Sequence, residues 1–161
     1  MWRASWPARW PPPWRRPRPR SPPSETRDTE ANVAIPEVFL KAAVEEAAGC
    51  SAYPVDAGEG STPPYVVYSR SATSRDVYTT GGVGWAVGTF ALEIYADSYT
   101  QAKELADACS EALHNFSGIV ESVTIDICYL TDEKDGTPVF LDGRESPTYL
   151  VEHTYSIRWQ E

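Results

Sequence analysis

The sequence has 161 residues, a length that suits one domain. From residue 31 onward it has seven Lys and Arg against twenty Asp and Glu, a formal balance of −13, beyond the −9 of the whole chain. This acidity argues against direct binding to nucleic-acid backbones, because that attraction depends on basic side chains that neutralise phosphates. Runs of about eighteen apolar residues, which a membrane-spanning helix needs, are absent from the sequence. We therefore expect no membrane partner.

The first 31 residues differ sharply in composition from the rest. Residues 1–23 hold eight of the fourteen prolines and four of the six tryptophans, and residues 1–20 hold six arginines. Frequent proline opposes both helix formation and strand pairing. We therefore expect a disordered Trp/Pro/Arg-rich arm at 1–31 and a folded domain at 32–161. A mis-set translation start, or an arm that touches nucleic acid, lipid headgroups or a partner, are the alternatives.

The segment PEVFLKAAVEEAA at 36–48 predicts the first helix. Pro36 suits the first turn of a helix, the Ala, Leu and Glu residues favour the helical state, and Gly49 is placed to end it. We expect Val38 or Phe39 to face inward, together with Ala42, Ala43 and Ala47. The segment that follows, at 50–64, is rich in Gly, Pro and Ser and predicts a loop.

The segment 97–118 predicts a second, longer helix. Its apolar residues recur at steps of three and four, which is typical of a helix with one buried face. Ser98 and Gln101 have the spacing of a capping box, in which each side chain satisfies a backbone N–H of the first turn. Gly118 stands where a left-handed C-terminal cap is expected.

Four segments predict strands, at 65–71, 85–96, 119–130 and 148–159. Phe90, Leu92 and Ile94 alternate onto one face of the second strand. In the third, the face predicted to be apolar is formed by Val123, Ile125, Ile127 and Tyr129, and the opposite face by Ser122, Thr124, Asp126 and Cys128. The order α-β-β-α-β-β indicates an α+β fold, a four-stranded antiparallel sheet covered on one face by two helices.

The far face of this sheet is expected to be rather apolar for a surface in water. It would carry Trp85, Val87, Tyr95 and Leu130. Soluble monomers seldom expose a large contiguous apolar patch. The pattern therefore favours self-association.

Candidate catalytic groups are sparse. His114 and His153 have no Cys, His or carboxylate at ligand-like spacing on the same element, and we expect neither to be catalytic. The acidic residues of the predicted loop 131–147 resemble a cation site only in composition, because the spacing of an EF-hand is missing; they are Asp132, Glu133, Asp135 and Asp142. We predict no enzyme activity, no cofactor and no metal. Glu93 and Glu152 are expected to pair across strands or between subunits with Arg70, Arg75, Arg144 or Arg158.

Several stretches together resemble one known family. They are PPYVVY at 63–68, FALEIYADSYTQAKELADACSEALHNFSG at 90–118, IVESVTIDICYLTDEKD at 119–135 and YLVEHTYSIRWQE at 149–161. This pattern is similar to that of the phage tail-completion proteins, also called tail terminators, which close the tail tube and join it to the head of long-tailed phages (siphoviruses) and gene transfer agents. The likeness covers 36–161 and excludes the arm. It implies a virion protein at the head–tail junction, assembled in the host cytoplasm as a ring that is usually hexameric.

The resemblance also implies partners: the major tail tube protein, a head-completion or neck protein, and DNA that passes through the lumen without specific binding. A neck, head-completion or minor tail protein is the nearest alternative, and a small-molecule-binding α+β module is the alternative from another class. We expect the subunits to meet through two protruding hairpin regions, 72–84 and 131–147, and the adjoining sheet face. The predicted interface residues are Arg75, Tyr78, Trp85, Glu93, Tyr95, Phe140 and Arg144.

Overall fold

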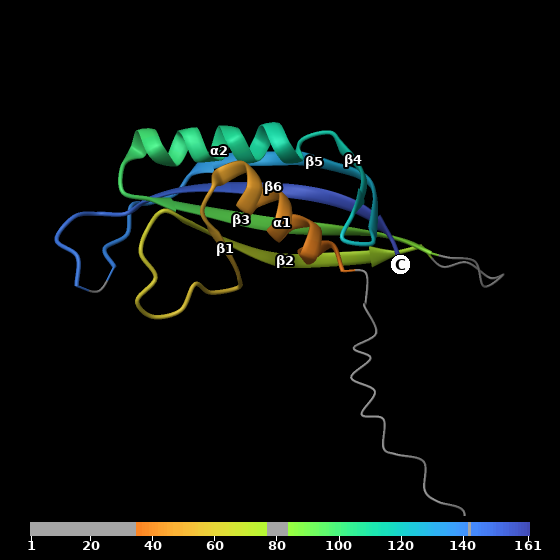
Figure 1. Ribbon diagram of the computed structural model, residues 1–161, viewed down its shortest axis with the longest axis horizontal. Coiled ribbons are helices and arrows are strands. Elements are labelled where there is room, and N and C mark those ends of the chain that lie inside the picture. The colour runs from red at the N-terminus through yellow and green to blue at the C-terminus, as the bar shows by residue number, and fades with distance from the viewer. Residues whose placement is uncertain (1–34, 77–83, 142) are drawn as a thin grey trace, which may run out of the picture. The chain divides into compact units, whose positions relative to one another are not determined.

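A computed structural model of the protein describes residues 35–76, 84–141 and 143–161. The predicted arm at 1–31, Tyr78 and Asp142 lie outside the described residues. The elements, labelled in Figure 1, are α1 (Pro36–Ala48), β1 (Ser51–Pro54), β2 (Tyr65–Arg75), β3 (Trp85–Ala96), α2 (Tyr99–Leu113), β4 (Phe116–Val120), β5 (Val123–Asp135) and β6 (Tyr149–Gln160).

All of these strands belong to one mixed sheet, in the order β1-β2-β3-β6-β5-β4. Only β1 and β2 pair in parallel; every other neighbouring pair is antiparallel. The prediction of a four-stranded antiparallel sheet was therefore wrong, because two further strands extend its edges. These edge strands have four and five residues, too few for a clear alternating pattern.

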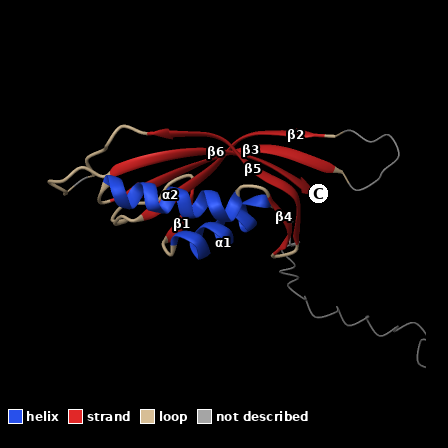
Figure 2. Cartoon of the chain, turned by 90° about the horizontal axis from the view of Figure 1, so that it is seen from above, coloured by secondary structure: helices blue, strands red, loops and turns tan. Residues whose placement is uncertain are grey.

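The sheet curls around both helices, which lie on its concave side (Figure 2). This inner face and the buried sides of the helices form the hydrophobic core. On β3, Phe90, Leu92 and Ile94 are fully buried, as predicted, and on β6 Tyr155 and Ile157 are too. The alternation along these two strands is regular, so each presents a second face, directed away from the helices, which we call the outer face.

Helix α1 has the predicted bounds, and Gly49 ends it with a left-handed φ of 62°. Of the two alternatives expected to face inward, Val38 and Phe39, the structure selects Phe39. Phe39, Leu40 and Val44 are fully buried, whereas Val38 remains 38% exposed. The predicted inward alanines are half-buried because they border a gap between the helices.

Helix α2 begins as predicted. Ser98 is the N-cap, and its hydroxyl accepts a hydrogen bond from the Gln101 backbone N–H at 3.2 Å. The Gln101 side chain accepts in return from the N–H of Asp97, one residue earlier than a standard capping box. The predicted end was wrong: the helix stops at Leu113, and Gly118 lies within β4.

The predicted third strand, 119–130, is in fact part of a β-hairpin. Glu121 and Ser122, with φ of 49° and 68°, make the turn between β4 and β5. Two left-handed residues suit the twist of a tight hairpin, but Asn-Gly is the usual signal, so the turn was missed. Such a turn without glycine is hard to read from sequence.

Val123 and Ile125 of β5 are buried as predicted, but a β-bulge reverses the predicted faces after Ile125. The register shifts between Ile125 and Ile127, so Cys128 points into the core and Ile127 points outward. Leu130 then faces inward, opposite Tyr155, and does not belong to the outer face as predicted. An extra residue in one strand moves the side chains that follow to the other face, until a second shift between Leu130 and Asp132 returns Glu133 to the inner face. Simple alternation cannot foresee either shift.

Candidate assembly surfaces

The outer face carries several exposed apolar side chains. Val87 on β3 is 38% exposed, and Ile127 and Tyr129 on β5 are 38% and 40% exposed. Trp85 is half-buried at the start of β3, where the Arg158 guanidinium lies 5.3 Å from its ring centroid. This surface combines apolar area with fixed charges, a mixture typical of protein–protein contacts.

Glu93 lies in the middle of the outer face and is held by a tyrosine. The Tyr95 hydroxyl donates a 2.7 Å hydrogen bond to Glu93 Oε2, and the rings of Tyr65 and Tyr95 stack with centroids 4.9 Å apart. Burial raises the pKa of Tyr95, and the hydrogen bond to Glu93 raises it further. The tyrosine therefore stays protonated and continues to donate to the carboxylate.

The arginines expected to pair with Glu93 and Glu152 have other partners within the chain. Arg75 Nε lies 2.7 Å from Glu161, Arg144 Nη2 lies 2.6 Å from Asp97, Arg70 pairs with Glu37, and Arg158 faces Asp126 and Asp76. Glu152 is paired with Lys134 at 2.9 Å. Pairing of Glu93 between subunits stays a prediction.

The structure does not gather the predicted interface residues into one site. Arg75 and Trp85 lie where β2 and β3 adjoin the C-terminal residue, whereas Arg144 lies at the other end of β3, bound to Asp97. Phe140, on the loop that contains Arg144, is 69% exposed. Glu93 and Tyr95 lie toward the same end of β3 as Arg144, which lines a cleft with Tyr65, the ring stacked on Tyr95. These residues therefore mark separate parts of the surface.

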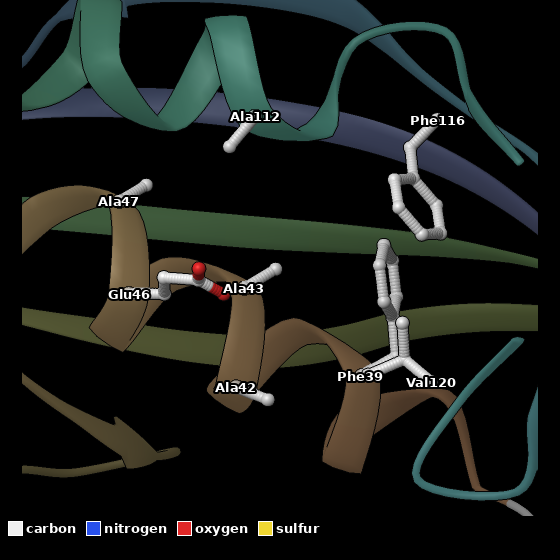
Figure 3. A pocket seen from close by; sticks show the side chains of 8 residues that line it. All are labelled: Phe39, Ala42, Ala43, Glu46, Ala47, Ala112, Phe116 and Val120. Carbon is white, nitrogen blue, oxygen red and sulfur yellow. The ribbon is translucent and has the colours of Figure 1, made fainter. Parts of the chain in front are cut away.

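An apolar groove lies between α1, the end of α2 and β4 (Figure 3). Its volume is about 380 Å³, and the Phe39 and Phe116 rings at one side have centroids 4.8 Å apart. Four alanines leave the space open, and Glu46 stands at its rim. The lining residues are Phe39, Ala42, Ala43, Glu46, Ala47, Ala112, Phe116 and Val120. Sequence reasoning missed the groove, although small residues on both helices were its signal.

A second, more polar cleft of about 520 Å³ lies between two loops. The segment 56–62 forms one wall, and Leu141 and Arg144 form the other, with Tyr65 also in contact. Arg144 is fixed there by its ion pair with Asp97. The cleft therefore lies between the predicted arm 131–147 and a loop that was not predicted from the sequence to lie beside it.

A buried polar cluster connects α2 to the sheet on the inner face. His153 is 1% exposed; its Nδ1 lies 3.0 Å from the Tyr155 hydroxyl and its Nε2 lies 3.4 Å from Glu133. Lys103 of α2 pairs with the same glutamate and with Asp135. Burial lowers the pKa of His153, although the Glu133 carboxylate opposes this. The cluster ties helix to strands and has the arrangement of a structural network.

The acidic residues considered for a cation site lie mostly on β5 rather than in a loop. Glu133 and Asp135 are engaged by Lys103, and Tyr99 donates a 2.9 Å hydrogen bond to Asp135. The described residues contain no group of three or more His, Cys, Asp or Glu placed to hold a metal ion. None of the described helices is long and apolar enough to span a membrane.

Two solved structures are similar in part to the structure of this chain. A chain from the virion of a native gene transfer agent particle is 18% identical, with 76% of this chain and 84% of that chain covered and a TM-score of 0.49. A second solved chain is 16% identical, with 79% and 92% covered and a TM-score of 0.43. No curated protein matches the sequence. Because these identities and TM-scores are low, the two structures do not assign the chain to a family, and that assignment depends on the sequence match.

The sequence itself matches the family described as Tail completion protein gp17 over residues 39–137. The match spans α1 through β5 and so includes both helices, the groove and most of the sheet. It agrees with the resemblance carried by residues 36–161. The chain belongs to this family of tail completion proteins, and it is a structural protein of the phage virion tail.

Proposed function

We propose that the protein forms a ring, most simply a hexamer, that closes the tail tube and joins it to the head. The family match over 39–137 carries this proposal, because a protein that completes a tail acts at its end. The partners would be the major tail tube protein and a head-completion or neck protein. The protein would act by shape and contact, without a catalytic step or a cofactor.

The two sides of the fold support a ring. Identical subunits close into a ring through heterologous contacts, in which two different surfaces of the same chain meet. Here the outer face lies on one side of the sheet and the helices lie on the other (Figure 2). Exposed apolar residues occur on both sides, such as Val87 on the outer face and Val38 on α1. The predicted interface residues, Tyr78 included, remain our candidates for these contacts.

The acidic balance suits a passage for DNA. From residue 31 onward acidic residues outnumber basic ones by thirteen. Like charge weakens adhesion between a lumen wall and the phosphate backbone. We therefore propose that carboxylates line the passage and that DNA slides through without specific binding.

Native mass spectrometry of the full chain, with negative-stain images of the same sample, tests the ring. We expect one closed species of six subunits and a six-fold image. A chain that stays monomeric up to high concentration would contradict the proposal. If the ring forms but binds only the head-completion or neck protein, or only the major tail tube protein, the result would indicate a neck, head-completion or minor tail protein instead.

The apolar groove favours a second candidate, a module that binds a small apolar molecule. Its 380 Å³ would accept a ligand of modest size. Thermal unfolding with a panel of apolar ligands distinguishes the two. A ligand-dependent rise in Tm for a chain that forms no ring would favour this candidate.

A further inference from the structure

Nearly every basic side chain of the folded part has an acidic partner within the chain. The sequence from 35 to 161 contains seven Lys and Arg, and six of them form ion pairs. Lys41 is the remaining one, and it forms no ion pair with any residue that the structure describes. It is exposed on α1. Among the described residues, which are strongly acidic, one cation without an ion pair is conspicuous.

Glu93 is its electrostatic counterpart on the other side of the sheet. It is half-buried on the outer face and directly opposite Glu152 in the pairing of β3 with β6. Like charges that face each other across strands destabilise a sheet. Lys134 neutralises Glu152, but Glu93 receives only the Tyr95 hydroxyl among the described residues. A cation from outside the chain would relieve this repulsion.

The surroundings of the two charges also match. Ile35 and Val38, each 38% exposed, precede Lys41 at steps of three, so apolar area adjoins the cation. Ala91 lies two residues from Glu93 on the same face of β3, and Leu150 lies two residues before Glu152 on β6. Each surface therefore has apolar side chains beside its charge.

We propose that α1 of one copy packs on the outer face of the next copy and that Lys41 pairs there with Glu93. The two residues lie on opposite sides of the sheet, since α1 occupies the concave side (Figure 2). Each copy thus offers both halves of a heterologous contact, which repeats around a ring. Burial of Ile35 and Val38 supplies attraction, and the ion pair fixes orientation and partner choice. This inference rests on the proposed ring and names a subunit contact within it.

Charge reversal in the full-length protein tests the contact. Lys41→Glu or Glu93→Lys should each weaken assembly about tenfold or more, as expected when like charges are opposed in an interface. The double variant Lys41→Glu/Glu93→Lys should return to within about threefold of the wild type, because the pair is restored with its signs exchanged. Sedimentation velocity over a concentration series measures assembly. Glu104→Lys, at an exposed position of α2, is the matched control and should assemble normally.

The outcomes separate this contact from the ring itself. Rings that persist in both single variants, or a double variant without rescue, would overturn the contact and leave the ring standing. A wild-type chain that never assembles would overturn both. Circular dichroism verifies that each variant folds, and Lys41→Gln with Glu93→Gln provides a milder pair should a reversal unfold the chain. The Gln variants should each weaken assembly less than the reversals do.

Discussion

At the scale of single residues, the core depends on a polar group as well as on apolar packing. His153 is buried between α2 and the strands, where Lys103 and Asp107 of α2 and Glu133 of β5 set its electrostatic environment. Its own strand contributes the Tyr155 hydroxyl. A neutral imidazole fits this position, because burial penalises the charged form.

Acid should therefore weaken the fold through His153. The pKa of the buried imidazole lies below its ordinary value of 6.5. Just below pH 6.5, His153 is therefore protonated in the unfolded chain and still neutral in the folded chain. The free energy of unfolding should fall as pH drops from about 6.5 to the folded pKa. Denaturant titrations of the wild type and of His153→Gln across this range measure it. The variant should show a shallower dependence on pH, and Glu104→Gln should match the wild type; equal slopes for His153→Gln and wild type would contradict the prediction.

Gly88 permits a close approach of two aromatic rings in the core. A Cβ at this position would lie 2.8 Å from Phe90 and 2.9 Å from Trp159, whose rings are buried. Gly88→Ala should therefore lower the free energy of unfolding by about 1–3 kcal/mol, the cost of overpacking. Urea denaturation measures the loss. Ser156→Ala on the outer face is the control and should change it by less than about 0.5 kcal/mol; a fully stable Gly88→Ala would show that the rings can move apart freely.

At the scale of elements, the long helices and strands could be predicted because each follows one period throughout. The bounds of α1 and β3 match the prediction, and so does the Ser98 cap. The pattern of β5 failed because a bulge changes its phase at Asp126. β1 and β4 are short, and pairing with longer neighbours, rather than local pattern, makes them strands.

The cap of α2 is open to a direct test. Ser98→Ala removes the acceptor for the Gln101 N–H and should lower the free energy of unfolding by about 1 kcal/mol. Ser110→Ala, near the end of the same helix, is the matched control and should be neutral or slightly stabilising, since Ala has the higher helix propensity. Chemical denaturation of both variants supplies the comparison. Equal stability of the two would mean that the cap contributes little.

The candidate surfaces could be predicted only in part. Glu93, Tyr95 and Trp85 were identified because alternation along β3 places them on one face. The groove depends on how α1, α2 and β4 pack, and no local pattern records that packing. Sequence likewise places Glu93 on a strand but does not show that Glu152 lies opposite it. Register across a sheet is a property of the whole fold.

At the scale of the whole molecule, the family assignment makes the protein a structural part of the virion tail. The matched region 39–137 includes both helices and the strands β1 to β5. The curled sheet separates a helical side from the outer face (Figure 2), and a subunit with two unlike sides is suited to repeated contacts around a ring. What such a ring would do depends on where in the particle it sits.

Immunogold electron microscopy of intact virions, with antibodies against the folded protein, locates it directly. We predict label at one point on each particle, where the tail meets the head. Label distributed along the tail, or confined to the end far from the head, would contradict a role in closing the tail tube and joining it to the head.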